Sequence, residues 1–549
     1  MASQRTFANL LALLLAGIAC LSLTSCSSLD PGGNAASPPR QTTDLAAGNE
    51  PPAETPPPPS EAPATSPPLS PNGPLELTVE DAVLLALENN NAFRVQRLNP
   101  PIRRTFEQQE RAAFDPVLTA TASKRRADAQ RLARAGAETE SFVSDTTSGE
   151  LSVSTLLPTG TTVALGTDTE MTESSLYRES FASTRLGLTV TQALLRGLGT
   201  GVNLATLRQA RLDTLASQYE LRGFAEWLVA QVETAYWDYA LARRQIEIFT
   251  QSLKLAEDQQ AETVERIQVG ALAETELAAA QAEMALRRED LINARSSLAT
   301  IRLRLLRLVN PPGASPWERE VVLQDHPVAL HVTLDDVESH VRLASRMRSD
   351  LNQARLQVKR GDLELVKTRN GLLPRLDLFV TLGMTGYAKS FGRSFGEIGT
   401  ENYDVLAGLT LEYPVANRDA SARHHRAILS NRQNAEALGN LAQLVEVDVR
   451  SAYVEVNRAS EQVAATSATR ALQEEKLRAE TEKFRVGKST TLLVAQAQRD
   501  LVASQISEIQ AVVNHRKALV ELYRLEGSLL ERRGILAPVP EPVSPSFTL

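Results

Sequence analysis

The second half of the chain repeats the first half at a fixed offset of 217 residues, without a gap. The matches include a Tyr, a Gln and a Gly, which chance alignment of two Ala- and Leu-rich helices would not readily produce. The repeated positions are Val232, Ala235, Tyr236, Glu265, Val269, Gly270, Ala278, Ala280, Gln281, Ala294, Leu305, Arg307 and Leu308, which recur as Val449, Ala452, Tyr453, Glu482, Val486, Gly487, Ala495, Ala497, Gln498, Ala511, Leu522, Arg524 and Leu525. We therefore expect two copies of one unit in a single pseudo-symmetric body.

The N-terminus has the layout of a secretory signal. An apolar run at residues 7–23, too short for a stable membrane span, leads into Leu23-Thr24-Ser25-Cys26. These four residues are similar to a bacterial lipobox, in which the chain is cleaved before a cysteine that is then acylated. We expect residues 1–25 to be removed and Cys26 to carry lipid, palmitate included; the alternative is an ordinary signal peptide with an incidental Cys26. Ser27 after the cysteine favours the outer membrane.

Proline content separates a tether from the folded body. Residues 31–74 hold 14 of the 28 prolines and almost no large apolar side chain, which predicts an extended, disordered segment. No proline occurs from Thr159 to Asn310 or from Val415 to Ala537. Because an interior proline costs a helix about 3 kcal/mol, these stretches permit very long helices.

Periodicity predicts long helices in both halves. Apolar residues three and four apart form a coiled-coil seam at Leu291, Ala294, Leu298, Ile301, Leu305 and Leu308. Before Gly270 the helical pattern extends back to about Asn203, roughly 100 Å at 1.5 Å per residue. Gly270 and Gly487 stand where each rod can reverse. The pattern therefore predicts two helical hairpins with tips at Val269-Gly270-Ala271 and Val486-Gly487-Lys488.

Between the helices, apolar and polar residues alternate with the period of a half-buried strand. The segments are 118–122, 186–191, 376–385 and 405–413, with two shorter candidates at 151–155 and 161–166. The sequence leaves open whether the shorter pair lengthens a barrel or forms an extracellular loop.

The strands are the only candidates for crossing a membrane. No mature segment has the roughly 18 apolar residues of a spanning helix, and strands in lipid must close into a barrel to satisfy their backbone groups. Two hairpins supply four strands, fewer than the about eight of the smallest barrels, so several chains must pool their strands. The alternative is a soluble α+β protein with an ordinary sheet.

The sequence carries no catalytic motif. Gly487-Lys488-Ser489 resembles the end of a phosphate-binding loop, but Glu482 occupies the position of the required glycine. None of the six histidines lies in a zinc-binding arrangement, and no nucleophile elbow or dinucleotide fingerprint occurs. A net charge of -8 without a basic patch gives no indication of nucleic acid. We expect no enzyme, cofactor or metal, and we expect Tyr236, Trp237 and Tyr239 to pack near the base of a helix.

Six short segments occur in a fixed order over roughly residues 75–530. They are Leu77–Asn90, Phe114–Leu118, Val190–Gly199, Leu373–Leu378, Tyr413–Val415 and Lys483–Gly487. Together they resemble the TolC family of outer membrane efflux proteins. The resemblance implies a mainly α fold with a membrane β-barrel portion, in which a homotrimer shares one 12-stranded barrel, continued by an α-helical periplasmic tunnel. It also implies docking to an inner-membrane transporter through a periplasmic adaptor protein.

The resemblance also implies roles for the hairpin tips. Residues Val269, Gly270, Ala271, Val486, Gly487 and Lys488 would contact the adaptor. In the family, acidic residues just beyond the tip glycine ring the closed periplasmic aperture; here the corresponding residues are Thr275 and Glu276 in the first repeat and Leu493 and Gln496 in the second, where aspartates are often found. A ring of three Glu276 side chains would attract cations; the alternative places Glu276 on a solvated outer face.

We therefore expect a lipid-anchored exit duct of the cell outer membrane that extends into the periplasm and passively conducts substrates of a tripartite efflux or type I secretion system. The expected domains are a signal peptide (1–25), a Pro-rich linker (26–74), two efflux repeats (75–310 and 311–530) and a tail (531–549). The alternative is a periplasmic coiled-coil adaptor or scaffold lipoprotein, although adaptors usually carry one helical hairpin. The substrate, the pump class and the adaptor stay open.

Overall fold

The computed structural model describes residues 73–132, 139–175, 179–270, 273–313, 316–329, 332–399, 401–486 and 488–535. They form two compact units. The sheet unit includes Gln109–Leu207 and Glu364–Arg426, and the helical unit includes Pro68–Gln108, Arg208–Leu363 and Ala427–Leu549. Both halves of the chain contribute to each unit, because each half contains helices and strands. Cys26 lies outside the described residues.

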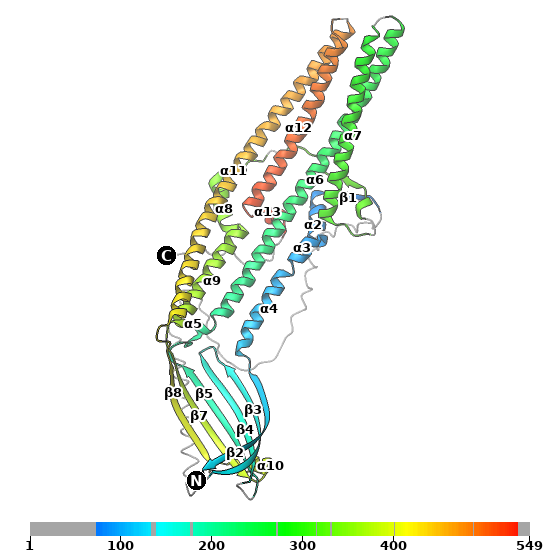
Figure 1. The fold of residues 1–549 in the computed structure, drawn as a ribbon. Helices are drawn as coiled ribbons and strands as arrows, with labels where there is room; N and C mark the ends of the chain where they lie inside the picture. The colour runs from blue at the N-terminus through cyan, green and yellow to red at the C-terminus, as the bar shows by residue number, and fades with distance from the viewer. Residues whose placement is uncertain are drawn as a thin grey trace, which may run out of the picture. The chain divides into compact units, whose positions relative to one another are not determined.

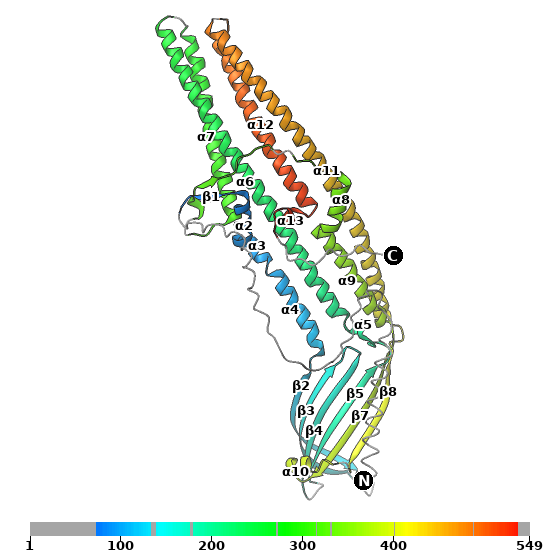
Figure 2. The same cartoon turned by 180° about the vertical axis from the view of Figure 1, so that it is seen from behind.

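The sheet unit contains one six-stranded antiparallel sheet with the strand order β2-β3-β4-β5-β7-β8 (Figures 1 and 2). Its strands are β2 (Val117–Leu132), β3 (Thr139–Leu156), β4 (Thr161–Ser174), β5 (Phe181–Ala193), β7 (Arg375–Ala388) and β8 (Tyr403–Glu412). The short helices η1 (Ala112–Phe114), α5 (Thr200–Asn203) and α10 (Phe391–Gly396) accompany them. All six segments with predicted alternation are therefore strands.

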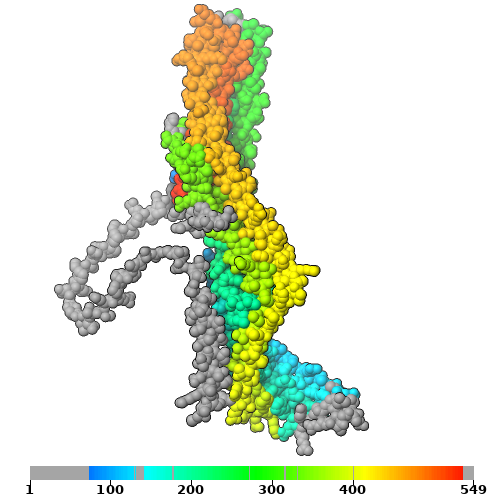
Figure 3. All heavy atoms as spheres, turned by 90° about the vertical axis from the view of Figure 1, so that its left-hand side faces the viewer, coloured from blue at the N-terminus to red at the C-terminus, as the bar shows by residue number. Residues whose placement is uncertain are grey.

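The helical unit is built on two long helical hairpins that lie side by side (Figures 1 and 2). The first pairs α6 (Ala205–Gln268) with α7 (Thr275–Val309), and the second pairs α11 (Arg418–Arg485) with α12 (Thr491–Leu525). Since α7 and α12 are each 35 residues long, the predicted duplication is confirmed in the fold. Side chains of α11 cover much of one side of this unit (Figure 3).

Shorter elements flank the two hairpins. They are β1 (Leu75–Leu77), α2 (Val79–Asn89), α3 (Asn91–Gln96), α4 (Asn99–Arg111), η2 (Pro316–Glu318), β6 (Val321–Leu323), α8 (Val337–Met347), α9 (Ser349–Gly371) and α13 (Leu529–Arg532). Strands β1 and β6 form a two-stranded parallel sheet. No helix in the described parts of the chain combines the length and apolar character needed to cross a membrane.

The duplication extends to the packing of the helical unit. Val232 and Leu305 are fully buried in one apolar cluster, and their repeat partners Val449 and Leu522 are fully buried in a second. The predicted seam on α7 is confirmed: Leu305 is buried in the first cluster, and Leu298, Ile301 and Leu308 pack against it. The remaining seam residues, Leu291 and Ala294, are buried as well. Each repeat therefore builds its own core from equivalent positions.

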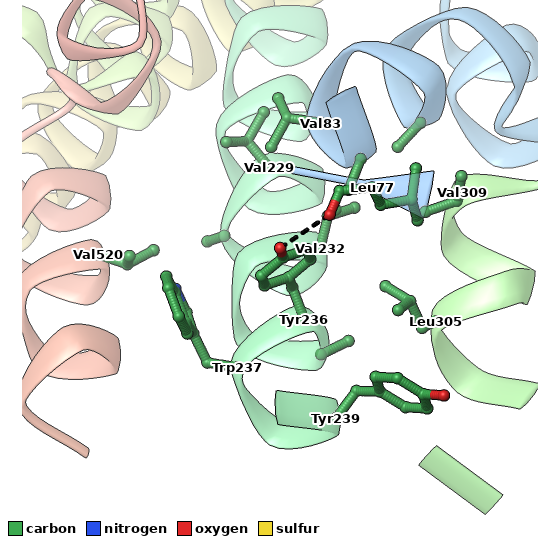
Figure 4. Close-up of a cluster of buried hydrophobic side chains, with 14 of the residues drawn as sticks. Leu77, Val83, Val229, Val232, Tyr236, Trp237, Tyr239, Leu305, Val309 and Val520 are labelled. Atoms are coloured by element: carbon green, nitrogen blue, oxygen red, sulfur yellow. Dashed lines mark hydrogen bonds between the residues drawn. The ribbon is translucent and has the colours of Figure 1, made fainter. Parts of the chain in front are cut away.

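Tyr236, Trp237 and Tyr239 belong to this core (Figure 4), so their predicted packing is confirmed, but they lie midway along α6 and not near the base of a helix. Tyr236 is fully buried, and its ring meets Trp237 edge to face at a centroid distance of 5.3 Å. The hydroxyl of Tyr239 donates a hydrogen bond to the carbonyl oxygen of Val321 at 3.0 Å. These rings join α6 to the small β1–β6 sheet.

Candidate functional site

One face of the six-stranded sheet is apolar across every strand. A single row of register partners consists of Leu118, Val153, Leu165, Leu188, Leu382 and Val405, one residue from each strand. Successive side chains of a strand point to opposite faces. The adjacent row, on the other face, is Thr119, Ser152, Gly166, Gly187, Gly383 and Asp404. Such a sheet suits lipid on one side and water on the other.

The apolar face is long enough to match a membrane. On β7 the apolar residues run from Leu376 to Met384, about 26 Å at the usual rise of a strand. The lipid-facing band of outer-membrane barrels is about 25 Å tall and is flanked by aromatic girdles. Tyr403 begins β8 and Tyr413 directly follows it, so an aromatic ring marks each end of that strand.

The opposite face carries an ion pair between β5 and β8, the strands on either side of β7. Arg185 on β5 donates through Nη2 to Oδ2 of Asp404 on β8 at 2.5 Å, and the two side chains reach across β7 above Gly383. A Cβ atom at Gly383 would lie 2.4 Å from Oδ1 of Asp404, so only glycine leaves room for the pair. Charged groups that satisfy one another in this way are compatible with a water-filled lumen.

The β3–β4 hairpin, which contains both of the shorter strand candidates, is part of the six-stranded sheet. Both strands run the full height of the sheet, with 18 residues in β3 and 14 in β4. Their turn is held at the end of β5: the amide of Gly199 donates to Thr159 at 3.1 Å, and Nδ2 of Asn203 donates to Pro158 at 3.1 Å. The sheet therefore has two strands more than the four per chain expected from two hairpins.

The hairpin tips carry the residues expected to contact an adaptor. Val269 and Val486 are 74% and 67% exposed, and Lys488 is exposed as well. Gly270 has φ of +75°, the left-handed conformation predicted for a reversal at a glycine. Ala271 and Gly487 lie outside the described residues.

Of the expected aperture residues, Glu276 contacts the second hairpin. Oγ1 of Thr491 donates to Oε2 of Glu276 at 3.0 Å, which joins the first turns of α7 and α12. Thr275 and Gln496 are exposed, and Leu493 is 45% exposed. Thr491 was not selected from the sequence; its signal is that it begins α12 as Thr275 begins α7.

Further contacts between the hairpins lie close to the tips. The guanidinium of Arg266 on α6 lies 5.0 Å from the ring centroid of Phe484 on α11, a cation–π contact. Nε of Arg499 on α12 lies 3.9 Å from Oε2 of Glu283 on α7. Hydrogen bonds from Lys483 and Ser489 lower the pKa of Glu480, which keeps this carboxylate ionised beside the tip. Sequence reasoning missed the Arg266–Phe484 and Arg499–Glu283 contacts because they depend on how the two hairpins align.

His424 and His340 each have a hydrogen-bond partner. Nδ1 of His424 lies 3.1 Å from Oγ1 of Thr368, while the adjacent His425 is exposed. Buried His340 lies 2.5 Å from Oε2 of Glu526. Within the ranges that the structure describes, no group of three or more His, Cys, Asp and Glu side chains is placed to hold a metal ion.

Comparisons with known proteins identify a family and several solved structures that resemble this chain. A family model described as outer membrane efflux protein matches residues 83–310 and 341–528. Similar solved structures include the outer-membrane channel OprN, with a TM-score of 0.62 at 16% identity over 82% of this chain and 90% of that chain. The CmeC outer membrane channel of Campylobacter jejuni gives 0.61 at 14% identity over 82% and 86% of the two chains. CusC gives 0.60 at 17% identity over 85% and 99%. Among curated proteins, no sequence matches significantly.

Proposed function

This chain belongs to the outer membrane efflux protein family, and from this premise we propose that it is the passive exit duct of a tripartite efflux or type I secretion system. An inner-membrane transporter would supply the energy and a periplasmic adaptor would make the connection. The observation that carries the proposal is the amphipathic six-stranded sheet, whose apolar row continues through every strand. Within the described residues, neither β2 nor β8 at the edges of this sheet pairs with a further strand, so a membrane pore requires further copies.

The assembly that fits these features is a homotrimer in the outer membrane. The sheet units would pool their strands in lipid, and the helical units would form a periplasmic tunnel. Cys26, acylated after removal of residues 1–25, would add a lipid anchor, with residues 26–74 as its tether. The chain would then contribute two efflux repeats, 75–310 and 311–530, followed by a tail at 531–549. Insertion of a closed barrel would supply most of the membrane affinity, since one acyl chain alone binds only marginally.

The tips of the two hairpins are the proposed adaptor contacts. Exposed apolar side chains at Val269 and Val486, together with exposed Lys488, provide a surface that another protein can bury. Glu276 lies on the same end of the helical unit, hydrogen-bonded to Thr491. We place Glu276 at the periplasmic aperture, where its bond to the second hairpin would help to hold the closed state.

Substitution at a tip tests this function. Gly270→Pro removes the left-handed conformation that the reversal uses and should abolish transport without preventing insertion into the outer membrane. The control is Gly439→Ala, because Gly439 lies within α11 and an added Cβ atom would meet nothing within 4 Å. Normal export by Gly270→Pro would exclude the docking role, and failure of both variants to reach the membrane would indicate misfolding.

A photo-crosslinking residue at Val269 or Val486 identifies the partner. The expected product is a complex with a periplasmic adaptor. Leu472, which lies within α11 and is also exposed, provides the matched control site away from the tip. An adaptor captured equally well from Leu472 would contradict docking at the tips.

A further inference from the structure

We propose that three copies of this chain close one barrel of 18 strands, in which β2 of each copy pairs with β8 of the next. The inference rests on the proposed trimer. It differs from the 12-stranded barrel implied by the family resemblance, because each chain brings six strands to the sheet.

The β3–β4 hairpin has the pattern of a membrane-spanning hairpin. Val153 on β3 and Leu165 on β4 fall in the same register row as Leu188 on β5. On the other face, Ser152 and Gly166 continue the polar row. An extracellular loop would have no reason to keep this alternation in phase with the neighbouring strands, whereas a strand between lipid and a lumen must keep it.

The two edges of the sheet are suited to each other. Six antiparallel strands leave β2 and β8 running in opposite directions, so a β2–β8 junction would continue the antiparallel ladder. Both edges present apolar side chains on the same face, with Leu118 on β2 and Val405 on β8. Neither edge has a strand partner in the described residues, and an open edge is not tolerated in lipid.

The stagger of the strands also fits closure. The register row that starts at Val117, the first residue of β2, reaches Leu406 on β8, and β8 continues to Glu412. The strand ends therefore step by six residues across one sheet. If three such sheets join with their strand ends aligned, their offsets add up to a total shear close to the number of strands. A barrel whose shear equals its strand number has strands tilted by about 36°. Outer-membrane strands tilt by about 35–45°.

An 18-stranded barrel would give a wide exit. With strands about 4.8 Å apart and a tilt of about 36–40°, the backbone diameter is roughly 35 Å, against about 24 Å for 12 strands. Barrels of about 16–18 strands enclose an aqueous channel. The barrel would then offer little resistance to the passage of substrates, and selection among substrates would occur at the helical end of the duct.

Disulfide crosslinking between copies tests the proposal. Aligned strand ends bring Thr410 of β8 opposite residues near Thr119 of β2 in the next copy, on the polar face. Thr410→Cys is therefore combined with Thr119→Cys, Thr121→Cys or Ser123→Cys. The only native cysteines, Cys20 and Cys26, precede the described residues. In a 12-stranded barrel that leaves out β2 and β3, β8 would instead meet β4, so Thr410→Cys with Thr162→Cys or Ala164→Cys forms the competing set.

The full-length protein is oxidised in outer membranes, and its mass is measured after detergent extraction. The expected result is a three-chain mass with chain-to-chain disulfides from at least one β2–β8 pair and none from the β4–β8 pairs. A three-chain mass with β4–β8 disulfides, or with none from the β2–β8 pairs, would overturn the 18-stranded barrel and leave the trimer standing. A one-chain mass would overturn the proposed trimer itself.

Discussion

The hydroxyl of Tyr236 should hold the β1–β6 sheet against α6, and Tyr236→Phe should loosen this sheet. The hydroxyl lies 3.0 Å from the carbonyl oxygen of Leu77 and 3.0 Å from Oδ2 of Asp325, inside the core of Figure 4. Burial, with a contribution from Asp325, raises the pKa of Tyr236 above its usual range. The hydroxyl therefore stays protonated and remains a donor at any ordinary pH.

The magnitude follows from the partners that remain after the substitution. The amide of Gln324 still donates to the Leu77 carbonyl at 3.0 Å, and the amide of Val79 still donates to Oδ2 of Asp325 at 2.9 Å. Neither acceptor is left unsatisfied, and the amide of Asp325 loses only a long 3.4 Å bond to the hydroxyl. The cost should therefore be near that of one hydrogen bond to a charged group, about 1.5 kcal/mol. Local opening of the β1–β6 sheet should become roughly tenfold more frequent.

Amide hydrogen exchange of the assembled protein measures this opening. The informative amides are those of Leu75 and Gln324, which donate to Glu320 and Leu77 across the two strands. Tyr453→Phe is the matched control, since Tyr453 is the repeat partner and packs on the second apolar cluster. An exchange rate of these amides in Tyr236→Phe within about twofold of the wild-type rate would refute this role of the hydroxyl. An equal acceleration of their exchange by Tyr453→Phe would refute it as well.

Three further predictions concern the aperture, the pH response and the anchor. Glu276→Gln should weaken the bond from Thr491 and reduce cation preference in single-channel recording, with Glu274→Gln, just before α7, as control; unchanged selectivity would remove Glu276 from the pore. Burial, reinforced by Glu531 and opposed by Arg222, raises the pKa of Glu226 from 4.5 to about 7. The stability that protonated Glu226 contributes, up to about 3 kcal/mol, should be present below pH 4.5 and lost as pH rises through about 7. Thermal unfolding of Glu226→Gln should lack this pH dependence, and an unaltered profile would contradict the assignment. Cys26→Ala should block lipid labelling yet leave assembled protein in the outer membrane, whereas complete loss of insertion would give the anchor a larger role.

Periodicity and the repeat predicted the helical hairpins because both can be read directly from the order of residues, without knowledge of long-range contacts. The offset between Val232 and Val449 reflects equivalent positions on two helices, and both side chains are fully buried. Gly270 was predicted to adopt a left-handed conformation, and its φ of +75° agrees. The helix seam on α7 followed from spacing alone.

The extent of the β3–β4 hairpin could not be read from the sequence. Its apolar alternation is clear only near Leu151, Val153 and Leu165, and the outer part of β3 is rich in Ser and Thr. Membership in the sheet depends on the ladder to β2 and β5, which is a long-range property. The Thr491–Glu276 bond was missed for the same reason, because it joins two hairpins whose alignment no local pattern encodes.

Conductance of the purified protein in a planar lipid bilayer tests whether the amphipathic sheets of several copies enclose a water-filled exit duct. We expect discrete conductance steps from detergent-extracted oligomers, with larger or more frequent openings when Thr491→Val removes the hydrogen bond to Glu276. Oligomers with native secondary structure that insert into the bilayer and pass no ions, with or without this substitution, would contradict it.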